Sequence, residues 1–144
     1  MKFVITGLPR TRTAWFSAYF TNGVEHCYHE AIRDGINLGL SEGTADCGYA
    51  LFPWWAERQG DHKLVIIERP VEEVNKSLIQ INYPAEGTNF LADRLAELDG
   101  LRIIYGNIND EIHKIHEYLS IPFDQQRFDL FKELHIVGTR YVKS

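Results

Sequence analysis

The most constraining feature of the sequence is the run FVITGLPRTRTAWFSAYF at residues 3–20. Its apolar first part is typical of a buried β-strand, and the apolar spacing of its second part is typical of an amphipathic helix. Between them lies a glycine–proline turn with two arginines and two threonines. Such a turn directs the unpaired N–H groups and the positive dipole end of the helix at one place. We therefore predict an anion site, most often for phosphate, where Gly7 lets the backbone approach the anion closely.

The turn differs from the loop that binds nucleoside triphosphates. That loop reads G-x-x-x-x-G-K-[ST], and its Lys and Ser/Thr serve the terminal phosphates and magnesium. Counted from Gly7, the second Gly, the Lys and the Ser/Thr are replaced by Arg12, Thr13 and Ala14. The sequence therefore argues against ordinary phosphoryl transfer from ATP. An ordinary turn with surface arginines is the alternative for this segment taken alone.

Strand-like and helix-like segments alternate along the chain. We expect strands at Lys2–Thr6, Val24–His29, Ala45–Leu51, Lys63–Glu68 and Leu101–Tyr105, and helices at Thr11–Thr21, Pro53–Gln59, Val71–Ile81, Asn89–Leu98, Asn109–Leu119 and Asp124–Leu134. Gly35–Gly43 and the stretch from Asn82 to Thr88 are expected to be loops. The alternation predicts one three-layer α/β/α domain of the P-loop type over residues 1–144, with a mostly parallel sheet of about four or five strands. Ligands of such sheets bind outside the carboxyl ends of the strands.

A second motif follows the clearest strand, Lys63–Glu68. Arg69 stands at its carboxyl end, and Ser77 lies eight residues further on, in the next predicted helix. Because parallel strands end at the same edge of a sheet, Arg69 should lie near the Gly7 turn. Arg69 and Ser77 are therefore candidates for a second phosphate contact; taken alone, the motif favours a surface ion-pair arginine and a small tolerated serine.

Together, the two motifs resemble those of sulfotransferases. The family's 5′-phosphosulfate loop, P-[KR]-[ST]-G-[ST]-[ST]-[WL], stands here as PRTRTAW at residues 9–15, with Arg12 in place of the glycine. The pattern R-[DN]-P-x-[DE]-V-x-x-S stands as RPVEEVNKS at residues 69–77, with the proline one place early. The family's late Arg-Lys-Gly signature is missing, and Gly138-Thr139-Arg140 is a weak substitute.

The resemblance implies 3′-phosphoadenosine 5′-phosphosulfate as co-substrate, with no required metal. It assigns donor binding to Gly7, Pro9, Arg10, Thr11, Arg12, Thr13, Ala14, Trp15, Arg69 and Ser77. Arg10 would neutralise the charge that develops on the oxygen between phosphorus and sulfur. Arg69 and Ser77 would bind the 3′-phosphate. Trp15 would pack on the adenine, or else serve as a core aromatic of the first helix.

The acceptor needs a general base. His29 and Glu30 end the second predicted strand and should reach the ligand edge, so we expect Glu30 to be the base, with His29 as second candidate. Either could instead orient the other, and both could be surface residues. A metal site of His26, Cys27 and His29 is disfavoured, because strand alternation puts the two histidines on opposite faces. Trp54 and Trp55 could line an acceptor pocket, with core packing of at least one favoured, and His113 and His116 are expected to be solvated.

The net charge of −5 and the pI near 5.6 argue against a dedicated nucleic-acid-binding protein. No run of 18 apolar residues indicates a membrane span. We expect a cytoplasmic protein whose Cys27 and Cys47 are free thiols. Its partners would be the donor nucleotide and an acceptor of unknown identity. A non-catalytic nucleotide-binding module and a divergent nucleotide or small-molecule kinase are the alternatives.

Overall fold

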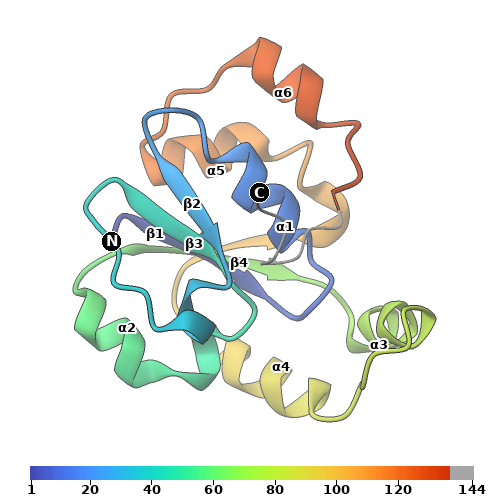
Figure 1. Cartoon of the computed structure of the whole chain (residues 1–144). Helices are drawn as coiled ribbons and strands as arrows, with labels where there is room; N and C mark the ends of the chain where they lie inside the picture. The colour runs from blue at the N-terminus through green and yellow to red at the C-terminus, as the bar shows by residue number, and fades with distance from the viewer. Residues whose placement is uncertain (137–144) are drawn as a thin grey trace.

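The centre of the fold is one parallel β-sheet. The computed structural model describes residues 1–136, in which five strands pair in the order β2-β3-β1-β4-β5, every neighbouring pair parallel. The strands are β1 (Phe3–Gly7), β2 (His26–His29), β3 (Glu42–Ala45), β4 (Lys63–Glu68) and β5 (Leu101–Ile104). Since all of them are parallel, their carboxyl ends lie at one edge (Figure 1). This confirms the predicted sheet.

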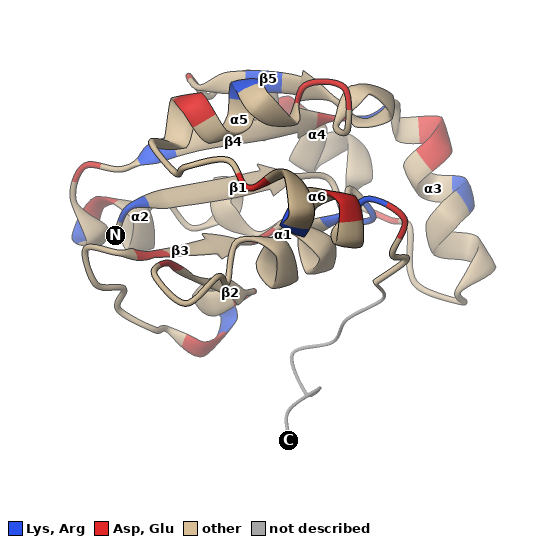
Figure 2. Ribbon diagram, turned by 90° about the horizontal axis from the view of Figure 1, so that it is seen from above, with Lys and Arg blue, Asp and Glu red and all other residues tan. Residues whose placement is uncertain are grey.

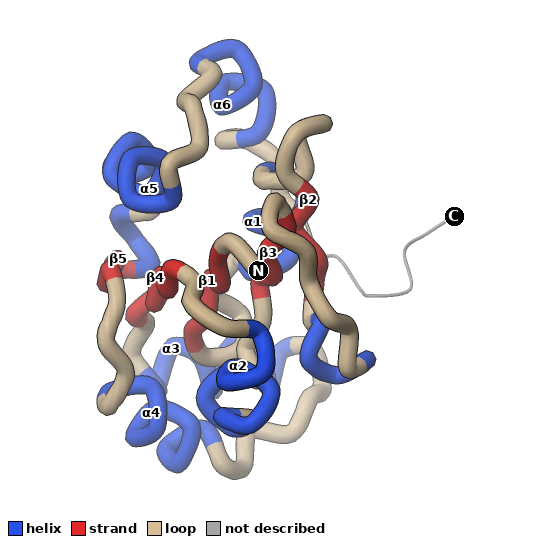
Figure 3. Tube along the Cα trace, turned by 90° about the vertical axis from the view of Figure 1, so that its left-hand side faces the viewer, coloured by secondary structure: helices blue, strands red, loops and turns tan. Residues whose placement is uncertain are grey.

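Helices cover both faces of the sheet and complete three layers (Figure 3). One face carries α1 (Thr13–Tyr19), α5 (Ile112–Leu119) and α6 (Gln125–Phe131); the other carries α2 (Pro53–Gln59), α3 (Val71–Gln80) and α4 (Thr88–Ala96). The described residues 1–136 also contain three short 3₁₀ helices, η1 (Ala31–Asp34), η2 (Tyr49–Leu51) and η3 (Tyr105–Asn107). The predicted three-layer α/β architecture is therefore confirmed.

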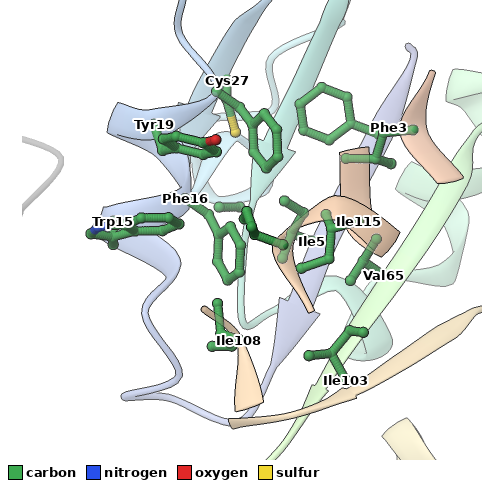
Figure 4. Close-up of a cluster of buried hydrophobic side chains, with 14 of the residues drawn as sticks. Phe3, Ile5, Trp15, Phe16, Tyr19, Cys27, Val65, Ile103, Ile108 and Ile115 are labelled. Carbon is green, nitrogen blue, oxygen red and sulfur yellow. The ribbon is translucent and has the colours of Figure 1, made fainter. Parts of the chain in front are cut away.

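The central strands are buried on both faces. Phe3 and Ile5 pack toward α1 and α5, whereas Val4 packs in a separate cluster with Trp55 of α2. Figure 4 shows Trp15, Phe16 and Tyr19 of α1 projecting into the first of these clusters. Burial on two faces explains why these strands read as continuous apolar runs and not as an alternating pattern.

The prediction for the third strand was wrong. β3 spans Glu42–Ala45 and not Ala45–Leu51. It therefore begins within the expected loop, Gly35–Gly43, and ends at the first residue of the predicted strand. Gly43 pairs with Phe3 of the neighbouring strand, and this position has room only for glycine because an added Cβ would lie 2.5 Å from the Phe3 ring. The strand then stops because the Asp46 carboxylate accepts a hydrogen bond from the Gly48 N–H at 2.8 Å, which closes a turn.

His116 is buried, contrary to the expectation that it is solvated. Its Nδ1 lies 2.9 Å from the carbonyl oxygen of Ile121, so Nδ1 carries the proton and donates it. Nε2 then accepts from the Tyr19 hydroxyl at 2.7 Å. Burial lowers the pKa of His116 and raises the pKa of Tyr19 to about 12. Both side chains are core groups in their neutral forms.

Of the two adjacent tryptophans, Trp55 is fully buried and Trp54 is half exposed. Within residues 1–136, Cys27 and Cys47 are both free thiols, and burial raises the pKa of Cys27 strongly. Basic and acidic residues are interspersed over the layers (Figure 2). In that same part of the chain, no helix has the length and apolar character that crossing a membrane requires.

Candidate functional site

A cavity of about 600 Å³ opens at the carboxyl edge of the sheet. Residues that follow all five strands line it, from the turn after β1 to Tyr105 after β5. Its lining residues are Pro9, Arg10, Arg12, Thr13, Ala14, Trp15, His29, Glu30, Arg33, Cys47, Arg69, Ser77, Leu78, Ile81, Tyr83, Tyr105, Leu134, His135 and Ile136. Every residue predicted for the site is among them except Gly7 and Thr11. Segments far apart in sequence thus meet at one cavity.

Gly7 and Thr11 lie beneath the turn and contact protein groups there. A Cβ on Gly7 would lie 2.7 Å from the carbonyl oxygen of Ile67 in β4. The buried Thr11 hydroxyl donates to the carbonyl oxygen of Leu8 at 2.7 Å. We expected both residues at the anion. Neither lines the cavity, because the turn packs tightly on β4.

Arg10, Arg69 and Ser77 meet on one side of the cavity. The Arg10 Nε donates to the Ser77 Oγ at 2.9 Å, although the two residues are 67 positions apart. The Arg69 Nη1 donates to the carbonyl oxygen of Arg10 at 2.6 Å, and the Arg69 guanidinium packs on the Tyr105 ring at 4.1 Å. An exposed ion pair with Glu73 is longer, at 3.4 Å. The two sequence motifs therefore form one cationic cluster.

Arg12 and Trp15 form a stacked pair beside this cluster. The Arg12 Cζ lies 4.0 Å from the Trp15 ring centroid, and its Nη1 donates to the Asn109 Oδ1 at 2.9 Å. Burial lowers the pKa of Arg12, an effect that the nearby Tyr105 opposes. The indole is only 1% exposed and donates from Nε1 to the carbonyl oxygen of Phe131 at 2.8 Å. The structure therefore places Trp15 in the core.

His29 ends β2 and Glu30 follows it, and both line the cavity. The His29 Nε2 lies 3.3 Å from the hydroxyl of Thr13 in the turn after β1. Glu30 has a left-handed backbone, with φ of 60°, and its Oε1 lies 4.0 Å from the Cys47 Sγ. Both predicted candidates for the base thus reach the cavity, at the end of β2, whereas Arg69 follows β4 on the other side of the central strand β1.

Asp46 is a supporting residue that the sequence analysis missed. Its side chain is 3% exposed and accepts from the N–H groups of Ile32 at 3.0 Å and Gly48 at 2.8 Å. Burial raises its pKa and Glu30 adds to the rise, whereas the two backbone hydrogen bonds and His29 oppose it. Asp46 therefore fixes the segments that carry Glu30 and Cys47. The sequence signal was Asp-x-Gly, which is typical of a turn, at the end of a short strand.

Cys47 and Arg33 line the same side and were likewise not predicted. Burial, together with the negative charges of Asp46 and Glu30, raises the pKa of Cys47 to about 12. Cys47 is therefore a neutral thiol at ordinary pH. Among residues 1–136, no three His, Cys, Asp or Glu side chains gather in an arrangement that could hold a metal ion. The weak candidate Arg140 lies outside the described residues.

The matches to known proteins come from comparison with solved structures. No family model and no curated protein matches the sequence. The sulfotransferase domain from the curacin biosynthetic pathway superposes with a TM-score of 0.65, over 99% of this chain and 80% of that one, at 11% identity. The chain has the sulfotransferase fold. Mouse sulfotransferase SULT7A1 complexed with PAP superposes with a TM-score of 0.64 over 90% of this chain, also at 11% identity.

The sulfotransferase fold agrees with the resemblance inferred from the two motifs. The superposition covers 62% of the length of the mouse sulfotransferase structure. Within that fold, the turn that carries Arg10 and Arg12 follows the central strand β1, and the Arg69 motif follows its neighbour β4. The site residues are thus positioned by the sheet itself.

Proposed function

We propose that the protein binds 3′-phosphoadenosine 5′-phosphosulfate and transfers its sulfuryl group to a hydroxyl or amine of an acceptor. The observation that carries the proposal is the cluster of Arg10, Arg69 and Ser77. It joins two motifs that a donor with phosphates at both the 3′ and 5′ positions would require. The sulfotransferase fold, and the PAP named in one similar structure, support the same donor.

The charge of the cavity suits an anionic nucleotide. Among the described residues, four arginines line it, against the single carboxylate of Glu30. Arginine presents several N–H donors and forms strong charge-assisted hydrogen bonds with phosphate oxygens. Arg69 and Ser77 would hold the 3′-phosphate. Arg10, Thr13 and the N–H groups of the turn would hold the 5′-phosphosulfate.

The transfer is a single displacement at sulfur. The acceptor oxygen or nitrogen forms a bond to sulfur while the bond from sulfur to the phosphate oxygen breaks. Adenosine 3′,5′-bisphosphate leaves, and Arg10 neutralises the charge on its departing oxygen. Glu30 accepts the proton of the acceptor, with His29 as the second candidate for this role. The place of both residues at the cavity, with His29 Nε2 3.3 Å from the Thr13 hydroxyl of the turn, supports this division of labour.

A thermal shift measurement tests the donor. We expect adenosine 3′,5′-bisphosphate to raise Tm more than AMP, ADP or ATP does, with or without magnesium, because a ligand of the native state stabilises it. Arg69→Ala should abolish the shift. Arg94→Ala, which removes an exposed arginine of α4 that does not line the cavity, is the matched control.

Two outcomes would redirect the assignment. An equal response to AMP would contradict the 3′-phosphate contact. Selective bisphosphate binding without sulfuryl transfer to any member of an acceptor panel would indicate a non-catalytic nucleotide-binding module. A magnesium-dependent response to ATP alone would instead indicate a kinase.

A further inference from the structure

Both faces of the Trp15 indole are covered by protein. Tyr19 stacks on it with ring centroids 4.7 Å apart and planes 17° from parallel, as Figure 4 shows. The Arg12 guanidinium lies 4.0 Å from the indole centroid and, because Tyr19 occupies one face, takes the other. With its Nε1 bonded to Phe131 as well, Trp15 offers no open ring face to a ligand.

The guanidinium of Arg12 is held in a position where a planar group of a ligand can stack on it. The guanidinium packs on the Trp15 indole, and Asn109 accepts a hydrogen bond from its Nη1 at 2.9 Å. Arg12 also lines the cavity, in the same turn as Arg10. A guanidinium is planar and delocalised, and nucleobases stack on it as they do on aromatic rings. Because two partners already fix its plane, little further ordering is needed when a ligand binds.

We propose that the purine base of the donor stacks on the Arg12 guanidinium and not on the Trp15 indole. The inference rests on the proposed function. It makes Arg12 the residue by which the cavity distinguishes a nucleotide from a bare bisphosphate. Arg12, which stands where the sulfotransferase pattern has glycine, would thereby be the residue on which the base stacks.

Two ligands separate base stacking from simple charge attraction. One is adenosine 3′,5′-bisphosphate, and the other is the abasic 1-deoxyribose 3,5-bisphosphate, which carries the same phosphates. Their Kd values are measured by calorimetry for the wild type, Arg12→Lys and Arg12→Gln. Lysine keeps the charge and covers the indole with its stem, whereas glutamine keeps a planar group without charge.

We expect Arg12→Lys to reduce the preference for the base-bearing ligand about tenfold, because cation–π and stacking contacts contribute on this scale. Its affinity for the abasic ligand should change by less than about threefold, because the charge remains. Arg12→Gln should weaken both ligands and retain most of the preference. Thermal unfolding of each free variant verifies that it is folded.

A lysine variant with undiminished or increased preference would overturn the inference, since it would show Arg12 to be only a cation or a group that the base displaces. Equal wild-type affinity for the two ligands would overturn it too, because no base contact would then exist. Failure of the wild type to bind either bisphosphate would instead refute the proposed function.

Discussion

The two sides of the cavity are built differently. On the side proposed to bind the donor (the donor side), formed by the turn after β1 and by Arg69 and Ser77, charged side chains make the contacts: Arg10 bonds to the Ser77 hydroxyl, and Arg69 bonds to the carbonyl oxygen of Arg10. On the side proposed to bind the acceptor (the acceptor side), formed by residues 29–33 and 46–48, the buried carboxylate of Asp46 instead holds backbone N–H groups. The first arrangement places charges, and the second fixes the course of the chain.

This difference indicates how each side should respond to substitution. A donor of fixed charge is recognised by particular side chains, so changes at Arg10 or Arg69 should weaken binding. A general base has to be held at one position, so changes around Glu30 should lower turnover or stability and leave donor binding intact. Five predictions test this contrast.

Replacing Glu30 by glutamine should have the largest effect. The amide cannot accept the acceptor's proton, and loss of a general base typically lowers the rate by about 10²- to 10⁴-fold. Binding of adenosine 3′,5′-bisphosphate, measured by calorimetry, should stay within about threefold of wild type, since an uncharged amide leaves the phosphate contacts in place. His29→Gln is the parallel variant. Full turnover in Glu30→Gln with loss in His29→Gln would transfer the role to His29.

Removing the Asp46 carboxylate should have the next largest effect. In Asp46→Ala, two backbone N–H groups lose their acceptor, and each loss costs about 1–3 kcal/mol when the group is buried. We expect the free energy of unfolding, measured with urea, to fall by about 2–6 kcal/mol in total. Asp124→Ala removes a carboxylate that accepts from a single N–H, that of Arg127, at an exposed site, and should cost about 1 kcal/mol.

The pH dependence of stability isolates the charge of Asp46. Because its folded-state pKa is raised above the value of an unfolded Asp, its contribution is fully present at acid pH and is lost as pH rises through the folded-state pKa. Asp46→Asn cannot ionise. The stability of wild type minus that of Asp46→Asn should therefore decrease as pH rises from about 4 to 7. A difference that grows over this range would contradict the raised pKa.

Gly7→Ala tests the packing beneath the donor side. The added Cβ would lie 2.7 Å from a backbone oxygen of β4 and 2.8 Å from the Thr11 hydroxyl, so the turn or the strand has to shift. Overpacking of this kind costs about 1–3 kcal/mol. Gly106→Ala is the control, because no heavy atom lies within 4 Å of its added Cβ. Equal unfolding free energies for the two variants would show that the turn is looser than its contacts indicate.

The sequence predicted the donor side better than the acceptor side, for a physical reason. Strand β4 and helix α2 have the predicted bounds, because an uninterrupted apolar run and an opening proline are local signals. Arg69 and Ser77 were placed correctly near the turn because parallel strands end at one edge. These features depend on short segments and on one general rule of sheet topology.

What sequence reasoning missed depends on contacts between distant residues. Gly43 fits its strand position because the Phe3 ring of the neighbouring strand leaves no room for a side chain, and misplacing that strand hid Asp46. The burial of Trp15 likewise depends on Phe131, 116 positions away. Neither contact has a periodicity or a motif in the sequence, so each becomes visible only once the layers are assembled.

The smallest expected effect concerns the backbone of Arg12 and is tested by comparing the unfolding free energies of two variants. Its φ of 67° is left-handed, a conformation that costs residues with a Cβ about 1–2 kcal/mol. Arg12→Ala and Arg12→Gly both remove the guanidinium, and only glycine relieves the backbone. We therefore expect Arg12→Gly to unfold with a free energy about 1 kcal/mol above that of Arg12→Ala.

At an ordinary helical position the order is reversed, because glycine is less favourable than alanine there by about 0.5–1 kcal/mol. Ala18→Gly in α1 is the internal reference for that reversal. Glu30 has the same left-handed backbone on the acceptor side, so Glu30→Gly should likewise be more stable than Glu30→Ala. If glycine is favoured at residue 30 and not at residue 12, then only the backbone at residue 30 is held in its left-handed conformation after the side chain is removed. The hydrogen bonds of Asp46 to neighbouring N–H groups would hold it there. The turn on the donor side would then be free to relax once its arginine is removed.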